Sequence, residues 1–485
     1  MVVPGRAAVC WLAAAGLLAV PACASFRPPD YDTVSAPPTA APVAGAGALP
    51  ITLPAALALT GANALDIQIA DERTRAAAAR LERANALWLP NVNVGIDYFR
   101  HDGQIQDIVG TVFTTSRSSL LLGVGPQAVV STADAVFGPL AARQLVRAAE
   151  ADAQTARNDT TLAVAVAYFN VQQARGEVAG AADALRRAED LVARTEKLAP
   201  DLAPDLEVNR AKAEAARRRQ GVEAAYERWQ LSSSELTRLL RLRPGTLVEP
   251  AEEPSLTVAL VEPGQPVEEL IAVGLTHRPE LASYQAVVQA ALTRARQEGK
   301  RPLYPTVAVR GVGSNPTGLA GGYFGGGVND DMQAFGPRFS VDVQAVWELQ
   351  GLGFGNRAAT RERAADSRRA MLELLRTQDA VAAEVTQAHA QLVRSARRLA
   401  AAGDEVRNAV ATAEKNLQGL GQTRRAGEQL VLVFRPQEAV AAVSALDQAY
   451  RDFYQAVGDH NRAQFRLYRA LGQPAEALAG LAAPR

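Results

Sequence analysis

Cysteine is almost absent from this chain: only Cys10 and Cys23 occur among its 485 residues. The sequence therefore has no disulfide framework and no cysteine pattern for zinc. Aromatic residues make up only 5% of the chain, whereas Ala, Leu, Arg and Glu are abundant, which is typical of long helices. The formal net charge is zero, so the overall charge gives no reason to expect a nucleic acid partner.

Catalytic motifs are missing as well. The four histidines lie far apart in different expected elements, without a metal-ligand spacing: His101, His277, His389 and His460. No nucleophile elbow, P-loop or Cys-x-x-Cys motif occurs. The glycine-rich string GLAGGYFGGGVNDD has neither the Lys-Ser/Thr end of a phosphate loop nor an acidic ladder for calcium, so we expect a flexible loop there. The sequence thus predicts no enzyme, no cofactor and no metal site.

The N-terminus has the pattern of an export signal. Arg6 precedes the apolar stretch Ala7 to Val20, which is too short to cross a bilayer, and no later stretch is apolar enough for a transmembrane helix. The string VPAC resembles a bacterial lipobox, which would make residues 1–22 a signal peptide and Cys23 the lipidated first residue. The alternative is A-x-A cleavage after Ala24. Residues 23–50 are rich in Pro, Ala and Thr, and we expect an extended tether.

The rest of the chain repeats itself. The string ALDIQIADERTRAAAARLERANALWLPNVNVGIDY echoes RPELASYQAVVQAALTRARQEGKRPLYPTVAVRG. Pro90 matches Pro305 at an offset of 215 residues, and LTRLL (236–240) matches LYRAL (467–471) at an offset of 231. Each copy reads helix, strand, loop, strand, long helix, turn, helix. We therefore predict two structural repeats.

Four alternating runs are predicted as strands of about ten residues, the length of a tilted transmembrane strand. In the first repeat they cover about 91–101 and 118–131, and in the second about 305–314 and 338–349. One side of each run is apolar and the other is small or polar, which fits lipid outside and water inside. A soluble sheet with one wet face is the alternative for any single run.

Sustained seven-residue spacing of apolar residues predicts two very long helices, about 139–198 and about 356–418. In the first, small residues occupy one seam position: Ala167, Ala174, Ala181, Ala188 and Thr195. At 1.5 Å per residue each helix would be roughly 90 Å long. Such helices must lie along neighbours for their whole length.

The strand count predicts assembly. Four strands cannot close a barrel, and lipid does not tolerate an open sheet edge. Two copies would make a barrel too narrow for large molecules, so counting favours three or more copies.

The sequence resembles the TolC-like outer membrane efflux proteins, including their lipoprotein branch. The resemblance covers roughly Leu49 to Gln473 and rests on the duplication, on VWELQGLGFGNRA (346–358), on RPELASYQAVVQAA (278–291) and on FRLYRALG (465–472). It implies an α+β membrane protein in which three chains form a twelve-stranded barrel, continued by a helical coiled-coil tunnel through the periplasm. It also implies a homotrimer in outer membrane lipid, docked to a periplasmic adaptor and an inner-membrane transporter of a tripartite efflux pump. The alternatives are the exit duct of a type I protein secretion system or, in another class, a periplasmic coiled-coil adaptor or scaffold.

The resemblance also assigns segments. It implies outward-facing loops at 102–117 and 314–337, and periplasmic tips at 199–205 and 419–429. At the second tip, Pro436 stands where a helix should already run, so we expect the returning helix to start late or kink. Candidates for the periplasmic aperture are an acidic ring (Asp201, Asp205, Glu414) and an interhelical latch (Arg424, Arg425), with solvated charges as the alternative. The expected barrel-to-tunnel hinges are Phe137-Gly138-Pro139, with Pro139 in a first helical turn, and Gly351, Gly353, Phe354 and Gly355.

The predicted organisation completes the expectation. After the signal peptide and tether come a first repeat (51–250), an inter-repeat linker (251–277), a second repeat (278–473) and a C-terminal tail (474–485).

Overall fold

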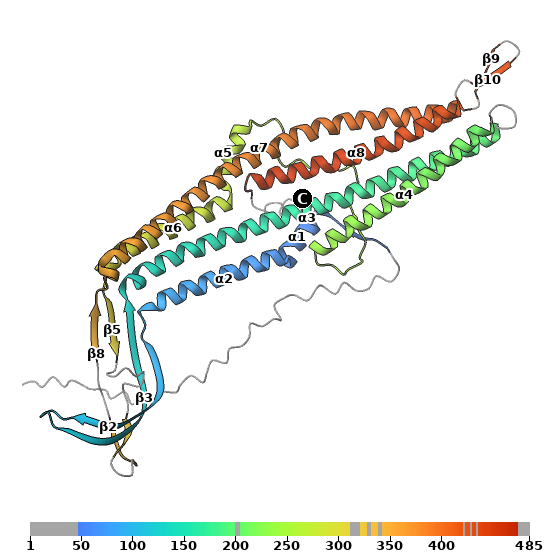
Figure 1. The fold of residues 1–485 in the computed structure, drawn as a ribbon. Coiled ribbons are helices and arrows are strands. Elements are labelled where there is room, and N and C mark those ends of the chain that lie inside the picture. The colour runs from blue at the N-terminus through green and yellow to red at the C-terminus, as the bar shows by residue number, and fades with distance from the viewer. Residues whose placement is uncertain are drawn as a thin grey trace, which may run out of the picture.

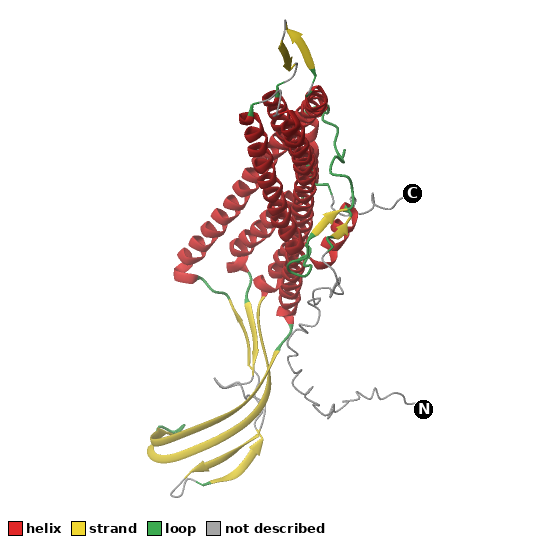
Figure 2. Ribbon diagram, turned by 90° about the vertical axis from the view of Figure 1, so that its right-hand side faces the viewer, coloured by secondary structure: helices red, strands yellow, loops and turns green. Residues whose placement is uncertain are grey.

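A computed structural model describes residues 47–198, 204–310, 321–326, 331–337, 342–420, 422–426, 429–432 and 435–473. Its helices form a long bundle with a β-sheet at one end and a small β-hairpin at the other (Figures 1 and 2). Cys23, the predicted lipidation residue, and Asp201, an aperture candidate, lie outside the described residues.

The two halves of the chain have the same order of main elements. The first half contains β1 (Leu49–Ile51), α1 (Leu53–Asn63), α2 (Leu65–Asn85), the 3₁₀ turn η2 (Ala86–Trp88), β2 (Asn91–Gln106), β3 (Val112–Ser131), α3 (Thr132–Leu198) and α4 (Asp205–Leu239). The second contains β4 (Val248–Pro250), α5 (Val267–His277), α6 (Pro279–Lys300), η3 (Arg301–Leu303), β5 (Thr306–Arg310), β6 (Gly321–Gly326), β7 (Met332–Pro337), β8 (Asp342–Val346), η4 (Gln350–Gly353), α7 (Phe354–Gly419), β9 (Thr423–Ala426), β10 (Gln429–Leu432) and α8 (Pro436–Ala470).

Two helices run nearly the length of the bundle. Helix α3 has 67 residues and α7 has 66, so each is about 100 Å long. Helix α3 packs against α4, α6 and α8, and α7 packs against α8. The five small seam residues predicted in the first long helix are all buried: Ala167, Ala174, Ala181, Ala188 and Thr195. Their small side chains let the neighbouring helices approach closely and cover them.

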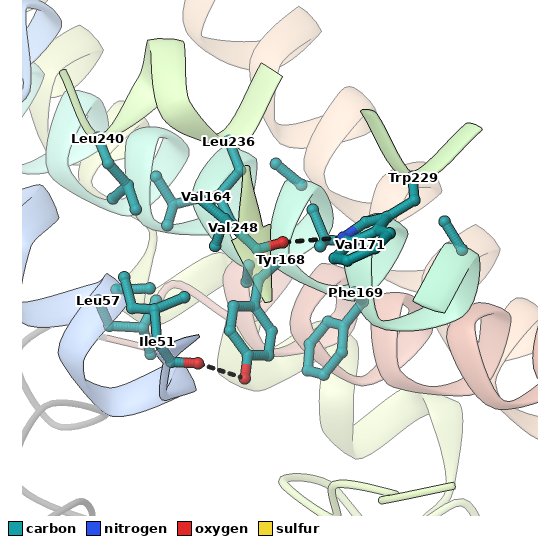
Figure 3. Close-up of a cluster of buried hydrophobic side chains, with 14 of the residues drawn as sticks. Ile51, Leu57, Val164, Tyr168, Phe169, Val171, Trp229, Leu236, Leu240 and Val248 are labelled. Atoms are coloured by element: carbon teal, nitrogen blue, oxygen red, sulfur yellow. Dashed lines mark hydrogen bonds between the residues drawn. The ribbon is translucent and has the colours of Figure 1, made fainter. Parts of the chain in front are cut away.

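The largest apolar cluster lies where α1, α3 and α4 meet (Figure 3). Tyr168 and Phe169 of α3 are fully buried there. The Trp229 indole N–H donates to the Val248 carbonyl at 2.9 Å. Strand β1 pairs in parallel with β4, so the starts of the two halves are tied together.

The predicted inter-repeat linker is held by buried amide side chains and ends in helix α5. Asn461 Oδ1 accepts a hydrogen bond from the Val258 amide at 2.8 Å. Gln464 Oε1 accepts from the amides of Leu260 at 3.0 Å and Val261 at 2.8 Å. Because both side chains are almost fully buried, this segment is a fixed strap across α8.

Six strands form the main sheet, in the order β7-β6-β3-β5-β8, with β2 on the other side of β3. Strands β5 and β6 pair with different parts of β3, at 128–131 and 117–121, so they lie in succession along one path. Strands β7 and β8 lie along the next path. The six strands thus follow four paths, which correspond to the four predicted strands.

Several predicted boundaries are wrong. Strand β2 reaches Gln106 and strand β3 starts at Val112, so most of the predicted loop 102–117 is strand. The predicted loop 314–337 contains β6 and β7, whose glycine-rich sequence lacks clear alternation. Residues 423–432 contain an antiparallel strand pair where a helix-to-helix turn was expected. Helix α8 does start late, at Pro436, where proline's missing N–H costs nothing.

One helical stretch among the described residues, Leu53–Trp88, has the length and hydropathy of a membrane-crossing helix. Its mean hydropathy is 1.2 over 18 residues, and 38% of that window is buried. It is therefore an exception to the prediction that no stretch after Val20 is so apolar. The stretch is interrupted at Ala64, which has an extended backbone, and α2 packs along α3.

Candidate functional site: a two-faced sheet and a latched helix end

The main sheet has one mostly apolar face and one more polar face. Directly paired residues share a face, and neighbours along a strand alternate between faces. Register and alternation place these residues on one face: Ile96, Tyr98, Leu120, Val130, Val307, Val309, Tyr323, Phe335 and Val343. The other face is mixed: its polar residues are Asp97, Ser119, Ser131, Thr306, Asp342 and Gln344, and its apolar ones include Phe99, Leu121, Val129, Phe324 and Val346. This arrangement suits a wall between lipid and water.

Aromatic side chains form a row across the apolar face. Tyr98 pairs with Leu120, Leu120 with Tyr323, and Tyr323 with Phe335. The rings of Tyr323 and Phe335 are in edge contact at 5.4 Å between centroids. Near the helices, Trp88 and Trp347 are exposed as a second aromatic level. Between Asn91 and Tyr98, strand β2 rises by about 18 Å if it is tilted by about 40°, and the turn η2 with Trp88 lies beyond its start.

The first strand-to-helix transition differs from the prediction. Helix α3 begins at Thr132, so Pro139 lies inside it rather than in its first turn. A proline inside a helix leaves the carbonyl four residues earlier without its N–H partner. Here the Trp88 indole N–H donates to that carbonyl, the oxygen of Ala135, at 3.1 Å. Phe137 meets the Tyr304 ring edge-on at 6.2 Å.

The second transition is a tight left-handed turn. Gly351, Leu352 and Gly353 have φ values of 52°, 57° and 86°, a region that favours glycine. Gly355 is required by close approach, because a Cβ there would lie 2.9 Å from the Gln350 carbonyl oxygen. Phe354 begins α7. The two transitions therefore have different structures.

The described aperture candidates lie on three different elements. Asp205 is exposed in the first turn of α4, where a negative charge complements the helix dipole. Glu414 of α7 lies 3.5 Å from Arg187 of α3. Arg424 and Arg425 lie in strand β9, opposite Val431 and Leu430, rather than on a helix.

A latch that the sequence reasoning missed joins α3 to α8 and α7. Asp183 of α3 accepts hydrogen bonds from the Tyr450 hydroxyl at 3.0 Å and from Arg187 Nε at 2.8 Å. Arg187 also reaches Glu414. Burial, together with the neighbouring Asp183 carboxylate, raises the pKa of Tyr450 to about 12. The hydroxyl therefore stays protonated and able to donate at neutral pH.

Two glycines of α3 seat the aromatic rings of α8 beside this latch. A Cβ added to Gly180 would lie 2.7 Å from Tyr450 Cβ, and one added to Gly176 would overlap the Tyr454 ring. The glycines therefore allow an approach that no larger residue permits.

A buried ion-pair group links α4 to α8 further along. Arg218 of α4 pairs with Glu214 at 2.9 Å and with Asp447 of α8. Asp447 also pairs with Arg451 at 2.8 Å. Arg218, Glu214 and Asp447 are all buried. Because each charge has a partner, the group fixes α4 against α8, whereas removing one partner would leave a buried charge.

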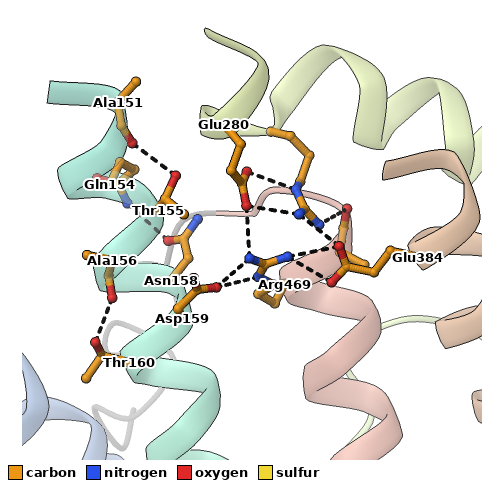
Figure 4. A network of polar contacts seen from close by, with 12 residues as sticks. Ala151, Gln154, Thr155, Ala156, Asn158, Asp159, Thr160, Glu280, Glu384 and Arg469 are labelled. Carbon is orange, nitrogen blue, oxygen red and sulfur yellow. Dashed lines mark hydrogen bonds and ion pairs between the residues drawn. The ribbon is translucent and has the colours of Figure 1, made fainter. Parts of the chain in front are cut away.

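A second cluster joins the two repeats near the sheet end of α8 (Figure 4). Arg469 contacts Asp159 of α3 at 2.6 Å, Glu280 of α6 at 2.9 Å and Glu384 of α7 at 2.8 Å. Arg278 contacts the same two glutamates, each at 2.9 Å. Burial opposes the charge of Arg469, but the three carboxylates raise its pKa above the ordinary value.

Among the described residues, no group of three or more His, Cys, Asp or Glu side chains could hold a metal ion. His389 and His460 each have a buried ring nitrogen without a hydrogen-bond partner. Burial lowers the pKa of His460, so its ring is neutral at pH 7.

No family model and no curated protein matches the sequence. Solved structures do match, and each covers 87% of this chain. The outer-membrane channel OprN has a TM-score of 0.68 and 20% identity, with 90% of its own chain covered. The CmeC outer membrane channel of Campylobacter jejuni has a TM-score of 0.69 and 15% identity, with 85% of its own chain covered. The outer membrane protein VceC of Vibrio cholerae has a TM-score of 0.66 and 17% identity, with 96% of its own chain covered. The chain therefore has the fold of the outer membrane channels.

Proposed function

We propose that three copies of this chain form a TolC-like outer membrane efflux channel, with a β-barrel in the membrane and a helical tunnel in the periplasm. One observation carries the proposal: a sheet with one mostly apolar and one more polar face runs directly into two helices of 67 and 66 residues. A soluble sheet needs no apolar outer face with aromatic rows. A coiled-coil adaptor needs no such sheet.

The sheet edges support three copies. Within the described residues, β2 lies at one edge and β7 and β8 lie at the other. An open edge carries unpaired N–H and C=O groups, which lipid does not tolerate. Edge-to-edge pairing of three four-path sheets closes a barrel of twelve strands and leaves no edge.

The aromatic levels support a position in the bilayer. The row containing Tyr98, Tyr323 and Phe335 would lie at the outer interface, and Trp88 and Trp347 at the periplasmic interface. The two levels lie on either side of a stretch of strand, as the aromatic girdles of membrane barrels do. A lipid group on Cys23, joined through the tether, would add a second attachment to the same membrane.

The transport mechanism has no covalent step. Substrate would enter from an inner-membrane transporter, pass through the tunnel and leave through the barrel. The latch of Asp183, Arg187, Tyr450 and Glu414 would hold the α7–α8 pair against α3 in the closed state. A periplasmic adaptor would open the tunnel by drawing these helices apart, with the β9–β10 hairpin, which extends beyond the helix ends, as a contact (Figure 1). Asp205 at the same end would favour cations.

The deciding experiment is purification from outer membranes in detergent, followed by mass determination and conductance in planar bilayers. We expect a mass near three times that of the processed chain, and ion-conducting steps. A water-soluble monomer without conductance would overturn the proposal.

An adaptor would leave the membrane on carbonate washing, whereas an integral barrel stays. Deleting the gene separates efflux from protein secretion. An efflux channel predicts that the deletion strain becomes sensitive to small toxic compounds, whereas a secretion duct predicts that an exported protein is no longer released.

Lipidation is tested separately with Cys23→Ser. Labelled palmitate should be incorporated into the parent protein and absent from the variant. Equal labelling of both would reject Cys23 as the acylated residue.

A further inference from the structure

Two phenylalanines occupy the more polar face of the sheet near its outer end. Phe99 pairs with Ser119, and Ser119 pairs with Phe324, so the two rings flank Ser119 on one face. Their chain neighbours Tyr98 and Tyr323 belong to the aromatic row on the opposite face. Phe99 is 57% exposed and Phe324 36% exposed, so both rings are at least partly open to the surroundings of the sheet.

These rings are the aromatic side chains of a face that otherwise mixes polar groups with aliphatic ones such as Leu121, Val129 and Val346. On the same face, Asp97 lies two residues nearer the helices, and Gln344 lies deeper. An exposed aromatic pair on a wetted wall has an unfavourable hydration free energy that packing does not offset. The Phe324 ring lies beside Gly336 of the next strand, where a Cβ would lie 3.4 Å from Phe324 Cε2.

We propose that Phe99 and Phe324 form an apolar ring at the outer end of the channel lumen, which slows hydrated ions and polar molecules and favours apolar or amphipathic substrates. The inference rests on the trimeric barrel proposed above. Twelve strands spaced by about 4.8 Å and tilted by about 40° give a radius of about 12 Å. Six phenyl rings at one level of so narrow a wall make a constriction of the kind that excludes water.

The test measures how fast a charged, membrane-impermeant maleimide, added to intact cells, labels a cysteine below the ring. Gln344→Cys is the reporter, because it lies on the lumen face about ten residues along the sheet from Phe99 and Phe324. Val343→Cys, the neighbouring position on the apolar face, is the negative control, because a cysteine that faces lipid should not react with a charged maleimide. The parent protein without an introduced cysteine gives the background from Cys23.

We expect Gln344→Cys to be labelled and Val343→Cys to stay at background. Replacing both rings (Phe99→Ala with Phe324→Ala) should raise the labelling rate of Gln344→Cys by about fivefold or more, because the dewetted constriction is removed. The matched control (Ile96→Ala with Val309→Ala) makes two equally apolar truncations on the opposite face and should leave the rate unchanged. All variants are compared at equal amounts of heat-resistant oligomer, so that loss of folding is not read as a change in access.

The outcomes separate the two proposals. An unchanged rate after removal of both rings, with Gln344→Cys still labelled, would overturn the apolar ring and leave the channel intact. Equal acceleration in the control would show a loosened barrel and also overturn the ring. Labelling of Val343→Cys with Gln344→Cys at background would reverse the faces, and the proposed barrel would fail with it.

Discussion

At the residue scale, the contact between α3 and α8 depends on the absence of a side chain. A Cβ at Gly180 would lie 2.7 Å from Tyr450, closer than real Cβ contacts allow. We predict that Gly180→Ala lowers stability by about 1–3 kcal/mol, because overpacking forces the helices apart. Gly221 of α4 has nothing within 4 Å of its Cβ position, so Gly221→Ala should raise stability by up to about 1 kcal/mol. Thermal unfolding followed by circular dichroism measures both, and a loss of equal size at the two sites would contradict the prediction.

The Tyr450 hydroxyl gives the latch a defined pH dependence. Its pKa is raised from 10 to about 12 by burial and by Asp183, so the folded state favours the neutral form. The stabilisation is therefore complete below pH 10 and is lost as pH rises through 12. Tyr450→Phe should lower stability by about 1 kcal/mol at neutral pH.

The measurement is the difference in melting temperature between the parent and Tyr450→Phe at pH 8 and at pH 11. We expect the difference to shrink at the higher pH, because the parent loses a stabilisation that the variant never had. A difference that grows with pH would show that the hydroxyl does not bind Asp183 in its neutral form.

At the element scale, the sequence predicts what periodicity controls. Heptad spacing locates both long helices to within about seven residues, and alternation locates β2, β3, β5 and β8. It misses β6 and β7, because their glycines hide the alternation and their pairing to β3 is set by tertiary contact. The predicted start of α3 is also too late, because a proline is typical of a first helical turn and the prediction places Pro139 there. Pro139 fits inside the helix because the Trp88 indole donates to the Ala135 carbonyl, a contact that the sequence does not show.

That explanation of Pro139 is tested by a double-mutant cycle. Trp88→Phe removes the indole donor and should cost about 1 kcal/mol, because the Ala135 carbonyl loses its hydrogen bond. In a Pro139→Ala background the backbone N–H of residue 139 can take over, so the same change should cost much less. Equal costs in the two backgrounds, measured by urea or thermal unfolding, would show that the two residues do not act on one carbonyl.

At the scale of the whole molecule, the candidate latch and clusters escape prediction because their partners are remote. Asp183 and Tyr450 are 267 residues apart, and Arg469 and Asp159 are 310 apart. Single charges on helix surfaces look alike in sequence, and only the packing of the two repeats shows which ones meet. The predicted aperture residues illustrate the limit: Glu414, expected in an acidic ring, lies 3.5 Å from Arg187 of α3, a partner that the sequence did not indicate.

The cluster around Arg469 is where the two repeats are held together, so its loss should affect the whole helical body. Arg469→Met would leave Asp159, Glu280 and Glu384 facing one another with only Arg278 to neutralise them. We expect a loss of about 2–3 kcal/mol, because partly buried carboxylates are left unpaired. The control is Arg238→Met on α4, which breaks an exposed pair with Glu235 three residues away and should cost less than about 0.5 kcal/mol. Raising salt should narrow the gap, because Asp159 and Glu384 of the Arg469 cluster are each nearly half exposed. Equal melting temperatures for the two variants would mean that α6, α7 and α3 are held by apolar packing alone.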